Sequence, residues 1–86
     1  SNYEMAGCVM EVKNGDYLAL LVHNSFETGH ELEVLRFDGT STPLHVHEMR
    51  EVSGSFISRA LPNRLVLLPA PEGTAVLNIV RRKIVC

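Results

Sequence analysis

The chain alternates short apolar runs with polar turns, and this pattern predicts strands throughout. No stretch of a dozen residues repeats apolar positions every three to four residues, as an amphipathic helix would. Short strands separated by turns at close intervals are typical of small antiparallel barrels and sandwiches. We therefore predict an all-β fold, a small antiparallel β-barrel of six or seven short strands. Six of these strands are expected at Met5–Lys13, Tyr17–His23, Glu31–Phe37, Pro43–His47, Arg64–Pro69 and Ala75–Arg81.

Glycine-containing turns connect the first four of these strands. Asn14-Gly15 stands between two apolar runs, and such a pair predicts a β-hairpin with a type I′ turn, in which both central residues take positive φ. Asp38-Gly39 predicts a second hairpin in the same way. Its return strand is expected to begin with Pro43, at a position where the ladder needs no N–H donor.

Several strands are apolar on both faces. In the second strand, Leu18, Leu20 and Val22 lie on one side and Ala19 and Leu21 on the other. An antiparallel sheet with one solvated face alternates apolar and polar residues more regularly. Two interpretations remain open: the outer wall of the barrel packs against another domain of a longer protein, or these residues pack at the ends of the barrel. The same pattern recurs in residues 65–68 and 76–80.

Length and composition limit the class of protein. The 86 residues are enough for one domain, 45% of them are hydrophobic and 21% charged, and this is an ordinary globular composition. No apolar stretch reaches the roughly 18 residues that a membrane-spanning helix needs, and no signal-peptide pattern is found. Two cysteines, Cys8 and Cys86, cannot form a disulfide-rich framework. We expect a cytoplasmic protein that does not contact membranes.

Charge is distributed unevenly along the chain. Residues 1–49 hold two bases and eight acids, a net charge of −6, whereas residues 50–86 hold six bases and two acids, a net charge of +4. We favour pairing between the two halves within one fold; a surface for an anionic partner such as RNA is the alternative. Aromatic residues, at 6%, form no interleaved stacking set. The candidate RNA-binding residues are Arg50, Arg59, Arg64, Arg81, Arg82 and Lys83.

One segment matches the first half of a cupin metal motif. After Gly39, His45 and His47 lie on the same side of a strand, and Glu51 follows, so that two imidazoles and a carboxylate could bind a first-row metal. No histidine follows His47 to supply the second half of the motif. The other interpretation is a solvent-facing His-x-His with Leu44 and Val46 buried. We expect no metal, cofactor or catalytic residue in this chain and keep the cupin-like site as the alternative.

The loop after the second strand carries a motif, Asn24-x-Phe26-x-x-Gly29, that resembles the signature of the C-terminal domain of the collagenase-like peptidase family, U32. The similarity extends over about residues 18–82, through a strand ending in Met49, a turn at Gly54 and a strand-plus-proline segment at 64–71. These segments follow one another along the chain in the order expected for that family.

The residues of this motif suit structural roles. An asparagine side chain such as that of Asn24 can cap a loop, Phe26 can anchor the loop on the barrel, and Gly29 can adopt a backbone conformation that other residues resist. We therefore expect structural roles for the motif positions that the resemblance marks, which are Asn24, Phe26, Gly29, Met49 and Gly54.

Three departures from the family pattern indicate a divergent member. His23 stands where the family usually has arginine or lysine, and His30 stands where it has aspartate. His45 and His47 stand where relatives commonly have acids or other polar residues, which argues against a metal site shared by the family.

The resemblance implies a noncatalytic, accessory role. In the family, chemistry is assigned to a larger N-terminal domain that resembles a (β/α) barrel. Members are described as peptidases or as prephenate-dependent RNA hydroxylation proteins with iron–sulfur ligands, and the tRNA-hydroxylation branch is the nearest in pattern. The chain would then be an excised C-terminal domain, with Ser1-Asn2 as an expression-vector scar. Its partners would be the N-terminal catalytic domain and, in the RNA-modifying branch, tRNA or another RNA.

Overall fold

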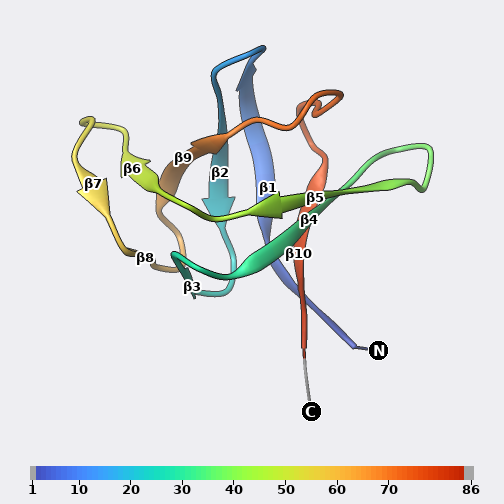
Figure 1. The fold of residues 1–86 in the computed structure, drawn as a ribbon, viewed down its shortest axis with the longest axis horizontal. Coiled ribbons are helices and arrows are strands. Elements are labelled where there is room, and N and C mark those ends of the chain that lie inside the picture. The colour runs from blue at the N-terminus through green and yellow to red at the C-terminus, as the bar shows by residue number, and fades with distance from the viewer. Residues whose placement is uncertain (1, 85–86) are drawn as a thin grey trace.

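The computed structural model describes residues 2–84, which contain β-strands and no helix (Figure 1). The predicted all-β class is therefore confirmed. Ser1 and Cys86 lie outside the described residues. Within residues 2–84 there is no helix long and apolar enough to cross a membrane.

The strands are β1 (Tyr3–Lys13), β2 (Tyr17–Val22), β3 (Phe26–Glu27), β4 (Glu31–Leu35), β5 (Ser41–His45), β6 (Met49–Glu51), β7 (Phe56–Ile57), β8 (Arg59–Ala60), β9 (Leu65–Pro69) and β10 (Ile79–Lys83).

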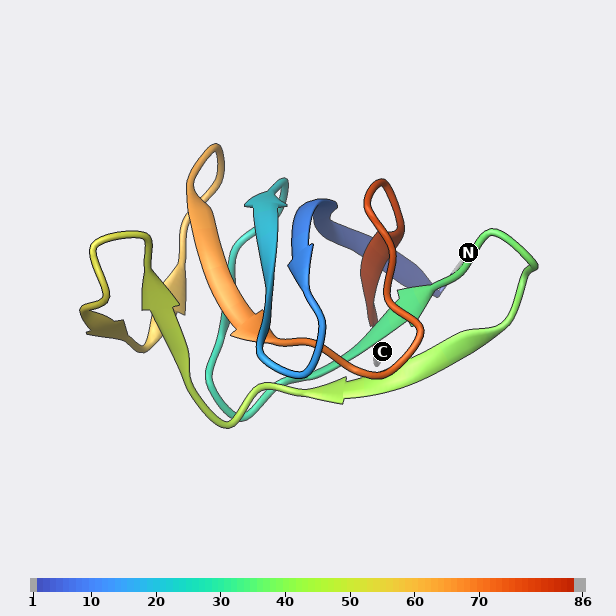
Figure 2. The same ribbon diagram turned by 90° about the horizontal axis from the view of Figure 1, so that it is seen from above.

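The strands form one large antiparallel sheet and a two-stranded addition. The large sheet has the order β5-β4-β10-β1-β2-β9-β6-β7, and β3 pairs with β8. The sheet is not closed into the predicted barrel, because β5 and β7 stand at its two ends and do not pair with each other. Only Val46–Glu48 separate β5 from β6, however, and this short link makes the sheet curl around its core (Figure 2). Core residues come from most strands: Ala6, Val9, Leu18, Leu20, Val22, Phe26, Leu32, Val34, Leu44, Val46, Met49, Ala60, Val66, Leu68 and Val80.

All six strands located from the sequence are present, with shifted ends. The four additional strands, β3, β6, β7 and β8, have only two or three residues each, which is why the alternation of residue types did not reveal them. The largest correction concerns residues 75–78, which form a turn; the last strand begins at Ile79.

Pro43 stands where the ladder needs no N–H donor, as predicted, but it does not begin its strand. It lies in the middle of β5, an edge strand, opposite Glu33 of β4. Backbone bonds at both ends of this ladder, Arg36 N–H to Thr40 O and Val46 N–H to His30 O, use even-numbered positions around β5. The backbone N–H and C=O groups of the odd-numbered residues of β5 therefore point away from β4. A proline at such a position removes an N–H from the open edge of the sheet. Such prolines protect edge strands from pairing with other chains.

The hairpin at Asn14-Gly15 is confirmed, but its predicted turn type is wrong. Lys13 pairs with Tyr17, which leaves three residues in the loop, and the Asp16 N–H donates to the Lys13 carbonyl at 3.0 Å. Gly15 has a φ of +76°, whereas Asn14 is not among the residues with positive φ. A type I′ turn needs two loop residues of that kind.

Candidate functional site

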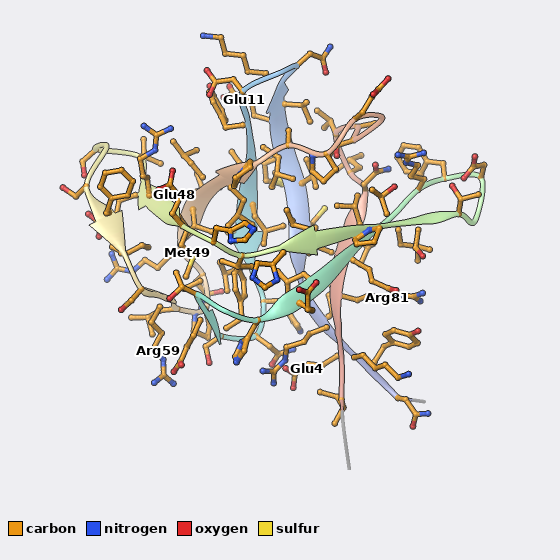
Figure 3. The ribbon with its side chains drawn as sticks, in the orientation of Figure 1. Glu4, Glu11, Glu48, Met49, Arg59 and Arg81 are labelled. Carbon is orange, nitrogen blue, oxygen red and sulfur yellow. The ribbon has the colours of Figure 1, made fainter. Side chains whose placement is uncertain are left out.

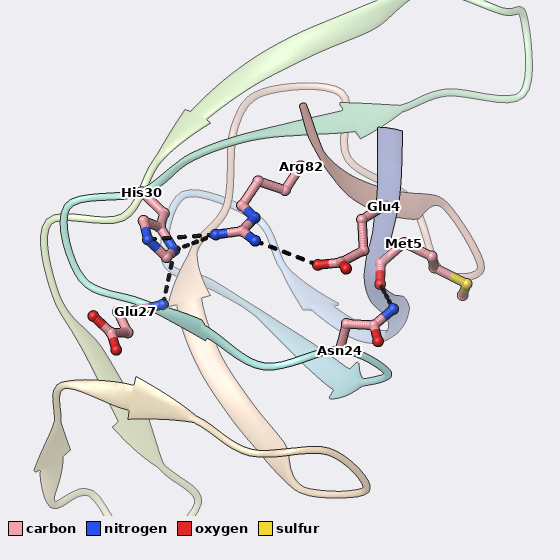
Figure 4. Close-up of polar contacts among 6 residues, drawn as sticks. All are labelled: Glu4, Met5, Asn24, Glu27, His30 and Arg82. Carbon is pink, nitrogen blue, oxygen red and sulfur yellow. Dashed lines mark hydrogen bonds and ion pairs between the residues drawn. The ribbon is translucent and has the colours of Figure 1, made fainter. Parts of the chain in front are cut away.

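The loop that carries the family-like motif is anchored at both ends. Phe26 is only 2% exposed and is the largest fully buried side chain of the described residues, so its ring fixes the loop on the core. Asn24 uses its side-chain Nδ2 to donate to the Met5 carbonyl at 2.8 Å, which ties the loop to β1 (Figure 4). These contacts join the chain's first strand to the loop after its second.

The other motif positions also shape the backbone or the core. Gly29 has a φ of +94° and donates its N–H to the Val46 carbonyl at 2.7 Å, which fixes the start of β4 beside the end of β5. Met49 is buried in the core, and Gly54 closes the turn between β6 and β7 with a φ of +98°. The motif thus builds the fold and brings no reactive side chains together.

His30 closes the turn before β4 and contacts the last strand. Its Nδ1 accepts the Glu27 backbone N–H at 3.1 Å, and Arg82 Nη1 lies 3.2 Å from the same nitrogen (Figure 4). Arg82 Nη2 reaches Glu4 at 3.5 Å. The imidazole Nδ1 is thus the acceptor that joins His30 to the Glu27 backbone across this turn.

The two histidines of the cupin-like segment are exposed, whereas Leu44 and Val46, which alternate with them along the chain, are buried, as the second interpretation predicted. The His45 and His47 rings lie 4.2 Å apart between centroids, and Nδ1 of His45 pairs with Glu31. Glu51 lies on β6, which pairs with β9, on the far side of the β5–β6 link. No group of three or more His, Cys, Asp or Glu side chains in the described part of the chain is arranged to hold a metal ion.

Three of the six predicted RNA-binding residues form ion pairs across the two halves of the sequence. Arg81 Nε lies 2.9 Å from Glu33, and its guanidinium also stacks on Tyr3, 3.8 Å from the ring centroid. Arg82 pairs with Glu4, and Arg59 lies 3.7 Å from Glu27. Each pair joins a base of the second half to an acid of the first, which confirms the interpretation of the charge asymmetry as internal pairing.

The remaining three bases form no ion pair with an acid of residues 2–84. Arg50 lies over the exposed Phe56 ring, 5.9 Å from its centroid. Arg64 precedes β9, and Lys83 ends β10. The six bases are not gathered on one surface, since Arg59 and Arg81 lie on opposite sides of the molecule (Figure 3).

An apolar surface covers the outer side of the central strands. Register places Cys8, Leu21 and Leu65 in one row across β1, β2 and β9, and Ala19 and Leu67 side by side in the next row. Leu21 is 40% exposed, Leu65 44% and Met10 46%. We call this surface the outer face; its members are Met10, Ala19, Leu21, Val52, Leu65 and Leu67.

The outer face is hollowed and bordered by polar groups. Part of it forms a groove of about 420 Å³, with Tyr17 and Glu11 at one end. The Tyr17 hydroxyl donates to Glu11 at 2.7 Å, and this hydrogen bond raises the pKa of Tyr17 above its usual value, so the phenol stays neutral. At the other side, Arg59 and Arg64 line a hollow of about 500 Å³ that shares Val52 and Leu65 with the groove.

Comparison with known families and solved structures identifies the family and supports the fold. The model of the peptidase family U32 C-terminal domain matches residues 1–81. This chain belongs to that family. Two crystal structures of the C-terminal domain of a Geobacillus thermoleovorans protein, described as a U32 peptidase, share its fold. One has a TM-score of 0.85 at 18% identity, covering 93% of this chain and 92% of that one. The other, a selenomethionine variant, has a TM-score of 0.84 at 18% identity, covering 92% and 99%. The search of curated proteins finds no match.

In this U32 C-terminal domain, sequence reasoning detected the outer face only in part. The doubly apolar pattern of β2 and β9 indicated Leu21 and Leu65. Met10 was missed because the β1–β2 register shifts between Val9 and Glu11, so simple alternation does not give the direction of its side chain. Val52 was missed because it lies in the turn after β6. For Met10, the sequence signal that could have indicated exposure is the high density of apolar residues in residues 8–12.

Proposed function

We propose that this chain is a noncatalytic accessory domain that docks on the larger catalytic part of a U32-family protein. The observation that carries the proposal is the outer face, where apolar side chains from three adjacent strands are exposed together. A C-terminal domain of a longer protein has an obvious partner for such a surface, the catalytic part to which it is joined. Contiguous apolar patches of this kind mark protein interfaces more often than isolated apolar residues do.

Charge at the margin of the outer face indicates the chemistry of the partner surface. Arg64 lies next to Leu65 and forms no ion pair with an acid of residues 2–84, while Arg59 is held only by a 3.7 Å pair with Glu27. A carboxylate on the partner could bind either guanidinium with two parallel hydrogen bonds. The complementary surface would then be apolar at its centre with an acidic group at its edge.

The docking proposal predicts that charging the centre of the outer face abolishes binding. With Leu21→Lys and Leu65→Lys together, the dissociation constant for the separately expressed catalytic part of the same protein should rise by about 100-fold or more, because central interface anchors carry most of the binding energy. Isothermal titration calorimetry measures this directly. The matched control is Phe37→Lys, which charges a 75% exposed aromatic residue in the β4–β5 turn and should leave binding unchanged. Equal binding by the double variant and the wild type would contradict the proposal.

A second candidate function is presentation of RNA to the catalytic part, as in the tRNA-hydroxylation branch that the sequence resembles. The specific observation in its favour is that Arg50, Arg64 and Lys83 have no acidic partner among the described residues, which leaves them available for phosphates. Arg50 beside the exposed Phe56 ring adds an aromatic surface on which a base could stack.

The RNA proposal predicts binding that depends on salt. In filter binding to total tRNA, Arg50→Ala, Arg64→Ala and Lys83→Ala combined should weaken retention at low salt. The salt slope should fall by about one unit for each phosphate that the variant no longer neutralises. Arg81 and Arg82 are left unchanged because their ion pairs support the fold. Lys13→Ala, on the acidic half of the chain, serves as the control and should bind like the wild type. Retention that does not change with salt would refute this second function.

A further inference from the structure

The turn before the last strand holds a leucine in a conformation that suits glycine. Residues 75–78 form a β-turn in which the Asn78 N–H donates to the Ala75 carbonyl at 3.1 Å. Its third residue, Leu77, has a φ of +72°. Turns with positive φ at the third residue strongly favour glycine or asparagine there, because a side chain with a Cβ clashes with the following carbonyl. The turn therefore stores conformational strain at Leu77.

Hydrogen bonds keep the strained turn in place. Asn78 is buried, and its side-chain Oδ1 accepts the Ala75 N–H at 2.9 Å. The Leu77 N–H donates to the Val9 carbonyl at 2.7 Å, and the Val9 N–H donates to the Asn78 carbonyl at 2.9 Å. Strained residues persist where the surrounding structure determines their conformation, and they concentrate at functional positions.

Packing within the domain does not account for the leucine. Leu77 is 57% exposed, and its neighbour Val76 is also exposed. The bond to the Val9 carbonyl places Leu77 beside the Val9–Met10 peptide, and Met10 belongs to the outer face. The turn rises beside β1, on the side of the molecule opposite β4 and β5 (Figure 2). The exposed, strained leucine is thus hydrogen-bonded to the residue that precedes Met10 of the outer face.

We infer that Leu77 is an apolar anchor of the docking surface, whose side chain enters an apolar pocket on the catalytic part of the U32 protein. The inference rests on the proposed docking function and adds a specific contact to it. Two observations favour this occupant: the chain belongs to a family of C-terminal domains, and the Leu77 backbone is hydrogen-bonded to Val9, next to Met10 of the outer face. A side chain that is already held in its bound conformation loses little conformational entropy on binding. The strained turn would favour binding in this way, because it holds the Leu77 backbone fixed.

Leu77→Gly tests the inference because it should change stability and binding in opposite directions. The urea midpoint of the domain should rise, since glycine relieves the strain. The dissociation constant for the catalytic part should increase by about tenfold or more, since the anchor is removed. Leu77→Ala separates the two effects: it removes the anchor and keeps the strained backbone, so binding should weaken without the gain in stability. Val76→Ala, at the preceding turn position, is the matched control for general loss of apolar surface and should weaken binding less than Leu77→Ala.

The outcomes distinguish this inference from the docking proposal. Weak binding by the Leu21→Lys and Leu65→Lys variant together with normal binding by Leu77→Ala would overturn the anchor and leave docking intact. Normal binding by both would overturn docking and the anchor together. A lower urea midpoint for Leu77→Gly would overturn the premise that the leucine is strained.

Discussion

Replacing Phe26 with alanine should lower the free energy of unfolding by about 3–5 kcal/mol, the usual cost of deleting a fully buried phenylalanine. Phe26 is 2% exposed and belongs to the core, and its short strand β3 is held in its two-stranded sheet by two residue pairs with β8. Removing the ring therefore leaves a cavity beneath a short strand and takes away the main contact holding the 24–29 loop. Urea unfolding followed by circular dichroism measures the change.

Phe37→Ala is the matched control for this substitution. It deletes the same side chain from a position that is 75% exposed in the β4–β5 turn, and we expect a change of no more than about 0.5 kcal/mol. If Phe26→Ala cost as little as Phe37→Ala, the motif phenylalanine would not be the anchor of its loop, and another explanation of the family signature would be needed.

Features determined by short stretches of sequence were predicted well. The six longer strands follow from local alternation and from turn residues, and the internal burial of Leu44 and Val46 follows from the period of two along a strand. The outer face was indicated because β2 carries more apolar residues than one face can hold. In each case, the information lies within about ten consecutive residues.

Features that depend on pairing between distant residues were not predicted in detail. The open ends of the sheet depend on β6 pairing with β9, and the sequence contains no local signal for that choice; the pairing of β5 with β4, in contrast, was indicated by the Asp38-Gly39 turn. The sequence predicts Leu77 in a strand because it lies in the apolar run of residues 75–80; the hydrogen bonds with Val9, nearly seventy residues away, fix it in a turn.

The basic residues illustrate the same limit at the level of the candidate site. Counting charges by halves predicted that pairing would occur, but the partners of Arg81 and Arg82 could not be named. Glu33 faces Arg81 because β4 lies beside β10, and Glu4 faces Arg82 because β1 lies on the other side of β10. Once those pairs are known, Arg50, Arg64 and Lys83 are the residues whose substitution tests the RNA proposal.

Gly7 was not identified from the sequence, and its replacement by alanine should destabilise the domain by about 3 kcal/mol, at the upper end of the usual cost of overpacking. It lies in β1 between Val22 of β2 and Val80 of β10, in the middle of the large sheet. A Cβ at this position would lie 2.3 Å from the Leu21 carbonyl oxygen and 2.8 Å from Leu20 Cγ. The clash involves backbone, so relief requires β1 and β2 to separate. Thermal unfolding monitored by calorimetry gives the loss of stability.

Gly39→Ala separates this steric effect from backbone strain. Gly39 has a φ of +88° and no atom within 4 Å of an added Cβ, so alanine there should cost about 1 kcal/mol through its backbone conformation alone. Gly7 is not among the glycines with positive φ, and its larger loss of stability would come from contact with β2. Losses of equal size at the two positions would mean that β1 and β2 can adjust to a side chain at Gly7. The close approach of these strands would then not be needed to align the outer face.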